Sequence, residues 1–221
     1  MDNITYAIIG CYPDKGMKSH GSKGLISFNN KRLFEHQLDW IQNTNTHNEY
    51  ETILICDFDI AKIKKTLISS KIKIHQVNNT NPIYAACELS KYDNLIIIDY
   101  GCLFNPVILD NFKRTSILCV TDNEHLDTGC VIKDNIVEHI FLDLHDDKFC
   151  NIFRISREDK TKILSNNKYK SFNLLYFEIL NMLIDSGSKV MAKKIDRKDF
   201  FYFTQMRQKN AANKFIKKLS N

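Results

Sequence analysis

Short apolar runs alternate with amphipathic segments through the first half of the chain. The strand-like runs cover residues 4–10, 52–56, 73–77 and 95–99. Between them, apolar residues recur at helical spacing over residues 33–41, 60–68 and 83–89. Asn81 and Pro82 open the last of these segments as an N-cap followed by proline at the first helical position. This β-α-β-α-β-α-β order predicts an α/β fold, with a mostly parallel (mixed) central sheet and helices on both faces.

The second half of the chain is mixed rather than strictly alternating. Strands are expected at residues 117–121, 129–132, 136–140, 149–155 and 189–195, with a hairpin turn at 133–135. Helices are expected at residues 158–164, 172–184 and 205–219. The aromatic run at residues 200–203 is interpreted as a core strand rather than a base-stacking platform. Because no repeat or linker separates the two halves, we expect a single domain over residues 1–221.

Composition restricts the class of protein. A chain of 221 residues with 43% hydrophobic content can bury one sizeable core, and no apolar stretch approaches the roughly 20 residues that span a bilayer. The 7 cysteines are scattered without a Cys-x-x-Cys pair, which is typical of reduced thiols in a core rather than of disulfides or zinc ligands. With no basic and apolar leader at the start, these features predict a cytoplasmic protein.

The formal charge of +5 is modest, and much of it lies in the C-terminal part of the chain. An amphipathic helix with a solvated basic face accounts for this charge, although it could also attract phosphorylated ligands. Nucleic acid binding is therefore not inferred.

Asp99 closes the most apolar run of the sequence, Leu95 to Ile98. In open α/β sheets, ligands bind in the crevice beyond the carboxyl ends of the strands, so a carboxylate at this point is a candidate metal ligand. Gly101 stands two residues later, where a second acid could have supported the metal.

The segment from Gly10 to Gly24 forms a glycine- and lysine-bearing loop after the first strand. Its backbone N–H groups could wrap phosphates, and its lysines could neutralise a departing pyrophosphate. The spacing matches neither a Walker loop nor a dinucleotide-binding turn. A surface loop with solvated lysines is the alternative interpretation.

The order of these motifs resembles that of sugar-phosphate and phosphocholine nucleotidyltransferases. The resemblance covers most of the chain and implies a Rossmann-like fold of the nucleotide-diphospho-sugar transferase (GT-A) type. It places Lys18 at the loop arginine and Lys23 at the phosphate-binding lysine, and Asn81 in the segment near the nucleotide. It also implies that Asp99 binds Mg²⁺ and that Gly10 and Ser22 contact the nucleotide. The implied partners are a nucleoside triphosphate and a small phosphorylated acceptor, joined with release of pyrophosphate.

Two departures from the family pattern keep other functions open. Gly101 occupies a position that is acidic in many members, and Phe203 stands where an acid usually precedes the threonine. These losses favour a catalytically silent relative that acts as a binding or assembly module. A glycosyltransferase of the same fold is the other alternative, although Asp57-Phe58-Asp59 is better interpreted as an acidic loop with Asp59 as an N-cap than as a nucleotide-sugar motif.

Overall fold

The structure is a computed structural model, and it describes residues 3–11, 22–45, 49–56, 60–67, 72–110, 112, 115–122, 126–142 and 145–219. Within these residues the main element is a 9-stranded mixed sheet in the order β5-β4-β1-β6-β11-β8-β12-β10-β9. The first four strands of this sheet, in chain order, are parallel: β1 (Ile4–Gly10), β4 (Tyr50–Cys56), β5 (Lys73–Gln76) and β6 (Asn94–Asp99). The predicted α/β class and the parallel half of the sheet are confirmed.

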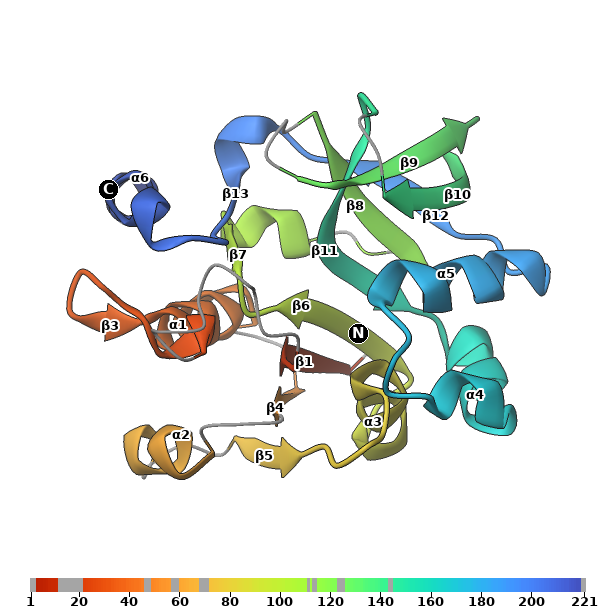
Figure 1. The fold of residues 1–221 in the computed structure, drawn as a ribbon, viewed down its shortest axis with the longest axis horizontal. Coiled ribbons are helices and arrows are strands. Elements are labelled where there is room, and N and C mark those ends of the chain that lie inside the picture. The colour runs from red at the N-terminus through yellow and green to blue at the C-terminus, as the bar shows by residue number, and fades with distance from the viewer. Residues whose placement is uncertain are drawn as a thin grey trace.

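Helices cover both faces of this sheet (Figure 1). One face carries α1 (Leu33–Thr44), α2 (Ile60–Thr66) and α6 (Lys209–Leu219), and the other carries α3 (Pro82–Leu89), α4 (Arg157–Ser165) and α5 (Tyr176–Asp185). Successive strand residues point to opposite faces, so Ala7 and Ile9 enter one core while Tyr6 and Ile8 enter the other. Burial on both faces is the reason that the parallel strands are nearly unbroken apolar runs.

The second half of the chain extends the sheet mostly with antiparallel pairs, and one pair, β12 with β8, is parallel. Its strands in the main sheet are β8 (Ile117–Thr121), β9 (Thr128–Lys133), β10 (Ile136–Leu142), β11 (Lys148–Ile155) and β12 (Met191–Lys194). Strand β11 lies antiparallel between β6 and β8, and it also pairs with β9 through Lys148 and Gly129. Two small sheets complete the described part: β2 (Ser27–Phe28) with β3 (Lys31–Arg32), and β7 (Cys102–Phe104) with β13 (Phe200–Tyr202).

Two predicted helix boundaries are wrong. Helix α5 begins at Tyr176 rather than at residue 172, because the segment before it is tied to the start of α3: Asn81 donates from its side-chain amide to the carbonyls of Ser171 and Leu174. The closing segment begins as a short 3₁₀ helix at Met206–Gln208, and only then continues as α6.

All seven cysteines are free and buried, which confirms that they act as core residues. None of the helices in the described ranges combines the length and the apolar character needed to cross a bilayer.

Candidate active site

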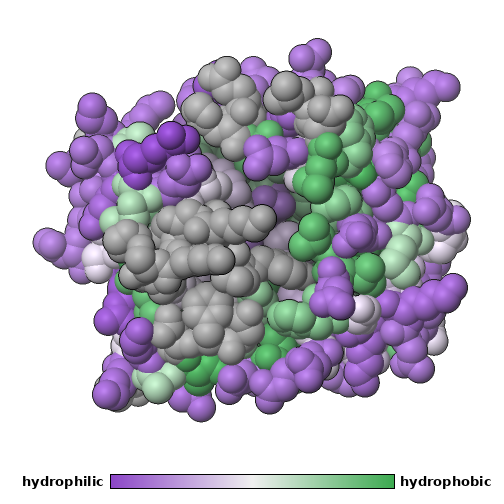
Figure 2. Space-filling view, viewed as in Figure 1, coloured by the Kyte–Doolittle hydropathy of each residue, from purple (hydrophilic) through white to green (hydrophobic). Residues whose placement is uncertain are grey.

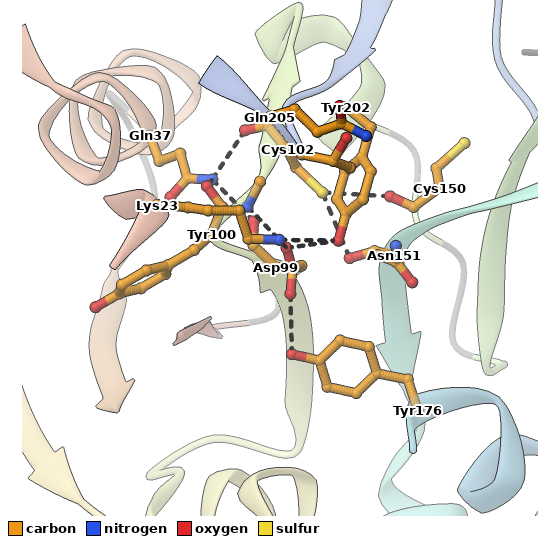
Figure 3. A network of polar contacts seen from close by, with 12 residues as sticks. Lys23, Gln37, Asp99, Tyr100, Cys102, Cys150, Asn151, Tyr176, Tyr202 and Gln205 are labelled. Atoms are coloured by element: carbon orange, nitrogen blue, oxygen red, sulfur yellow. Dashed lines mark hydrogen bonds and ion pairs between the residues drawn. The ribbon is translucent and has the colours of Figure 1, made fainter. Parts of the chain in front are cut away.

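Asp99 is the last residue of β6, and only 4% of it is exposed. Its Oδ1 atom accepts hydrogen bonds from the Gly101 backbone N–H at 2.7 Å and from the Tyr202 hydroxyl at 3.0 Å. Its Oδ2 atom accepts one from the Tyr176 hydroxyl at 3.2 Å (Figure 3). Three donors from three separate segments therefore hold this carboxylate at the carboxyl edge of the parallel strands.

Lys23 lies in a short 3₁₀ helix, Lys23–Leu25, and its side chain is almost completely buried. Its ammonium is 3.7 Å from Asp99 Oδ1 and 3.4 Å from the Tyr202 hydroxyl, which accepts its hydrogen bond. The same ammonium lies 5.0 Å from the centre of the Tyr202 ring. The structure therefore brings together two residues predicted for the site, Lys23 and Asp99, as an ion pair.

Tyr202 explains the glycine at position 101. A Cβ atom added to Gly101 would lie 2.8 Å from the Tyr202 ring and 2.9 Å from the Phe203 carbonyl oxygen. An acidic side chain therefore cannot occupy position 101 while Tyr202 keeps its place. On the side from which the second acid was expected, Phe203 is fully buried in the core and the group that reaches Asp99 is the Tyr202 hydroxyl.

Tyr100 accounts for two glycines at the ends of the predicted phosphate loop, Gly10 at the end of β1 and Gly24 in the 3₁₀ helix. Its ring lies so close to Gly10 and Gly24 that a Cβ atom on either residue would approach it to within 2.4 Å. Gly10 thus has a packing reason to be glycine, and its predicted contact with nucleotide stays a prediction. Ser22 is buried next to Lys23, and its carbonyl accepts the N–H of Leu25.

Two buried amides position the site from behind. Gln37 of α1 donates from Nε2 to the carbonyls of Asp99 and Cys102, at 2.9 Å and 2.8 Å, and so fixes the turn that follows β6. Asn81 is fully buried, and its Oδ1 accepts the Ile83 N–H at 2.8 Å as the N-cap of α3. The Asn81 amide also holds the chain just before Tyr176. Asn81 therefore helps to position the Tyr176 hydroxyl that donates to Asp99.

A cavity of about 230 Å³ opens over Asp99 and Lys23, with walls that include Phe149, Tyr176 and Tyr202. A neighbouring cavity of about 500 Å³ shares Phe149 and Tyr202 with the first. The volume of the second alone falls within the range of about 300–1,000 Å³ that is common for small-molecule sites. The ion pair of Asp99 and Lys23 therefore lies at one end of a space large enough for a substrate.

The surface beside this cavity is apolar. Leu142 of β10 is 62% exposed and Leu175, just before α5, is 39% exposed, and both line the cavity. Figure 2 shows apolar side chains gathered over this region of the molecule, between the β9–β10 hairpin and the start of α5. Exposed apolar side chains at the mouth of a cavity are typical of a ligand-binding surface.

The groups around Asp99 hold its carboxylate as the partner of Lys23 rather than as one of several metal ligands. Mg²⁺ requires oxygen ligands in near-octahedral order, whereas both carboxylate oxygens of Asp99 face hydrogen-bond donors and the ammonium of Lys23. Among the residues that the structure describes, no three His, Cys, Asp or Glu side chains come together as a metal-binding group. A metal ion at Asp99 would have to share the carboxylate with the Lys23 ammonium and the Tyr176 hydroxyl.

Cys102 is the thiol next to this site, and it is not a nucleophile. Burial, with the Asp99 carboxylate adding to it, raises the pKa of the Cys102 thiol well above its usual value. The thiol instead donates a hydrogen bond to the carbonyl of Cys150. It therefore stays protonated and is a poor candidate for nucleophilic catalysis.

Not every candidate from the sequence can be placed, and two residues of the site were missed. Lys18 and the motif at residues 57–59 lie outside the described residues. Sequence reasoning did not anticipate Tyr176 or Tyr202, and treated Tyr202 only as part of an aromatic strand. The signal for Tyr202 was its single hydroxyl in a run of phenylalanines, because a buried tyrosine hydroxyl usually has a polar partner.

Comparison with known proteins defines the class of fold. No protein-family model and no curated protein matches the sequence. Among solved structures, however, the chain has the fold of nucleotidyltransferases that act on small phosphorylated compounds.

Three of these structures are similar over nearly their whole lengths. The inositol-1-phosphate CTP transferase from T. maritima matches with a TM-score of 0.80 and 10% identity, over 98% of this chain and 96% of that one. A putative glucose-1-phosphate thymidylyltransferase from Bacillus anthracis matches with a TM-score of 0.75 and 10% identity, over 96% and 95%. The CTP:phosphocholine cytidylyltransferase from Streptococcus pneumoniae matches with a TM-score of 0.72 and 14% identity, over 98% and 100%.

Proposed function

We propose that this chain is a nucleotidyltransferase that moves a nucleoside monophosphate from a nucleoside triphosphate to a small phosphorylated acceptor. The observation that carries this proposal is the buried ion pair of Lys23 and Asp99, placed over a cavity at the carboxyl edge of the parallel strands. The similarity of the fold to enzymes with this activity supports it.

In this reaction an oxygen of the acceptor phosphate attacks the α-phosphorus of the triphosphate. The bond from the α-phosphorus to the bridging oxygen breaks, and pyrophosphate leaves with the electron pair of that bond. Such transfers depend on positioning and on neutralisation of phosphate charge rather than on covalent help from the protein. Lys23 supplies positive charge at the phosphates, and Lys18 is proposed to add to it from the N-terminal loop.

Asp99 has a different role in this proposal from that of a metal ligand. Its carboxylate, together with the Tyr202 hydroxyl, holds the Lys23 ammonium toward the cavity. Magnesium enters the proposal as the counter-ion of the triphosphate substrate, and no step of the reaction is assigned to a metal ion bound by the protein.

The direct test is pyrophosphate release with each of the four nucleoside triphosphates, offered with inositol 1-phosphate, glucose 1-phosphate or phosphocholine. We expect one combination to turn over, and Lys23→Gln to lower kcat about 100-fold, the usual cost of removing one group that stabilises transition-state charge. Lys133→Gln removes an exposed lysine from the β9–β10 hairpin and should leave kcat unchanged. Hydrolysis of UDP- or GDP-sugars without any triphosphate would instead support the glycosyltransferase alternative.

A catalytically silent binding protein is the second candidate, favoured by the protein donors that already occupy both oxygens of Asp99. Thermal unfolding separates the two candidates, because a ligand at 100 times its Kd adds about 2.7 kcal/mol to stability. Stabilisation by a triphosphate without turnover would support the binding protein. Indifference to every nucleotide would contradict the nucleotidyltransferase proposal.

A further inference from the structure

Asn151 is the exception in a strand that is otherwise buried. The other residues of β11 are buried, whereas Asn151 is partly exposed. Its φ of 55° lies in the left-handed region, which is uncommon within a strand and is tolerated best by Gly, Asn and Asp. Backbone strain of this kind, at a cost of order 1–3 kcal/mol, persists where the surrounding structure holds it and clusters at ligand sites.

A break in the register of β11 explains why Asn151 lies in the cavity rather than in the core. The pairing of β11 with β8 shifts between Phe149 and Phe153, as in a β-bulge. The rings of Phe149 and Phe153 lie 5.7 Å apart, although four residues of regular strand span about 13 Å. Since these rings contact each other, the core has no space for Asn151 between them, and Asn151 lines both cavities of the candidate site instead.

The surroundings of Asn151 in the cavity are polar, and the charged residues of each wall are balanced: Asp127 and Arg207 in the larger cavity, Asp99 and Lys23 in the smaller one. Thr128, Thr204, Gln205 and Gln208 supply hydroxyl and amide groups to the larger cavity. None of the hydrogen bonds of the described residues involves the side-chain amide of Asn151; its backbone carbonyl accepts a contact from the Cys102 thiol. Asn151 and Tyr202 both line the smaller cavity, and Figure 3 shows Asn151 near the Tyr202 hydroxyl.

We infer that the Asn151 amide determines acceptor specificity by hydrogen bonding to a neutral hydroxyl of a sugar or polyol phosphate. An amide can both donate to and accept from a hydroxyl, and the aromatic and apolar wall of Phe149 and Leu142 suits the carbon face of such a ring. A quaternary ammonium group has no N–H and no lone pair with which to hydrogen bond to the amide, and it would share the cavity with the ammonium of Lys23. This inference rests on the proposed function for the identity of the acceptor.

The test compares two asparagines with the same backbone conformation. Asn151→Gly removes the amide while glycine accepts the positive φ, and Asn135→Gly does the same at φ 62° in the exposed β9–β10 turn. Binding of inositol 1-phosphate, glucose 1-phosphate and phosphocholine is measured by titration calorimetry in the presence of the triphosphate that stabilises the protein most. We expect Asn151→Gly to weaken binding of the preferred sugar or polyol phosphate about tenfold, as for a lost hydrogen bond of about 1.4 kcal/mol, and Asn135→Gly to match the wild type.

The outcomes separate this inference from the proposed function. Both variants should keep a Tm within about 4 °C of the wild type, so that a loss of binding is not a loss of fold. Tenfold weaker binding in a protein that never releases pyrophosphate would refute the proposed activity and leave the role of Asn151 standing. Turnover with unchanged binding in Asn151→Gly would refute the role of Asn151 alone. Preference of the wild type for phosphocholine, or binding of none of the three acceptors, would also overturn the inference.

Discussion

Replacement of Asp99 by alanine distinguishes a structural counter-ion from a carboxylate kept free for metal. In the structure, Asp99 accepts hydrogen bonds from Gly101, Tyr176 and Tyr202 and pairs with the buried ammonium of Lys23. The substitution leaves all four groups without this partner, at a position where the side chains of Lys23 and Asp99 are almost completely buried. We therefore expect Asp99→Ala to destabilise the protein.

The magnitude follows from the number and burial of these contacts. Each buried donor that loses its acceptor costs about 1 kcal/mol or more, and breaking a buried ion pair from one side costs about 3–5 kcal/mol in total. The side chains of Lys23 and Asp99 are only 9% and 6% exposed, so solvent screening reduces this cost little. At about 2–4 °C for each kcal/mol in a domain of this size, Tm should fall by about 10 °C.

Urea unfolding followed by circular dichroism, with EDTA present, measures this free energy without any contribution from metal ions. Asp127→Ala is the matched control, because Asp127 lines the larger cavity but is exposed, and its loss should change stability by less than about 0.5 kcal/mol. If Asp99 were instead a buried carboxylate kept without protein partners in order to bind metal, its removal in the absence of metal would leave the free energy of unfolding unchanged or raise it. Unchanged or higher stability of Asp99→Ala would therefore refute the interpretation of Asp99 as a counter-ion.

Three further predictions concern the supports of the site and the core. Asn81→Ala should cost about 2–4 kcal/mol in urea unfolding, because an N-cap and two carbonyl partners are lost together, and a cost below 1 kcal/mol would contradict the anchoring role. Gly101→Ala should lower Tm by several degrees, since its Cβ would meet a backbone oxygen at 2.9 Å; an unchanged Tm would show that the turn can move. Burial raises the pKa of the Cys87, Cys119 and Cys130 thiols from 9.0 to about 12. Because only the unfolded chain loses these protons between pH 9 and pH 12, the free energy of unfolding should be unaffected below about pH 9 and should fall above it. At pH 10 each thiol should account for about 1.4 kcal/mol of this loss, and Cys119→Ala should reduce it by that amount between urea titrations at pH 8 and pH 10.

Local sequence patterns were sufficient to predict the parallel half of the sheet. A strand buried on both faces needs an apolar residue at almost every position, and this requirement is visible in β1, β4 and β6 without knowledge of their neighbours. The N-cap at Asn81 was equally local, because the capping oxygen and the N–H that it accepts are two residues apart. The position of Asp99 at the end of β6 followed from the same reasoning.

Features that depend on contacts between residues far apart in the sequence, such as the start of α5, could not be predicted from local sequence patterns. The apolar spacing after residue 172 is compatible with a helix, yet the chain stays irregular until Tyr176 because Asn81, about 90 residues earlier, holds the carbonyls of that segment. The strained conformation of Asn151 likewise depends on packing between Phe149 and Phe153 rather than on its own sequence.

The sequence by itself determined the class of fold and the strand that ends in Asp99, since each is specified by residues close together in the chain. Only the tertiary structure decided what surrounds Asp99. Tyr176 and Tyr202 lie 77 and 103 residues away in sequence, and their hydroxyls reach the carboxylate because α5 and β13 pack at the same edge of the sheet. The space that a second acid at position 101 could have used is filled by the Tyr202 ring, and Asp99 pairs with the Lys23 ammonium instead of with another carboxylate's metal ion.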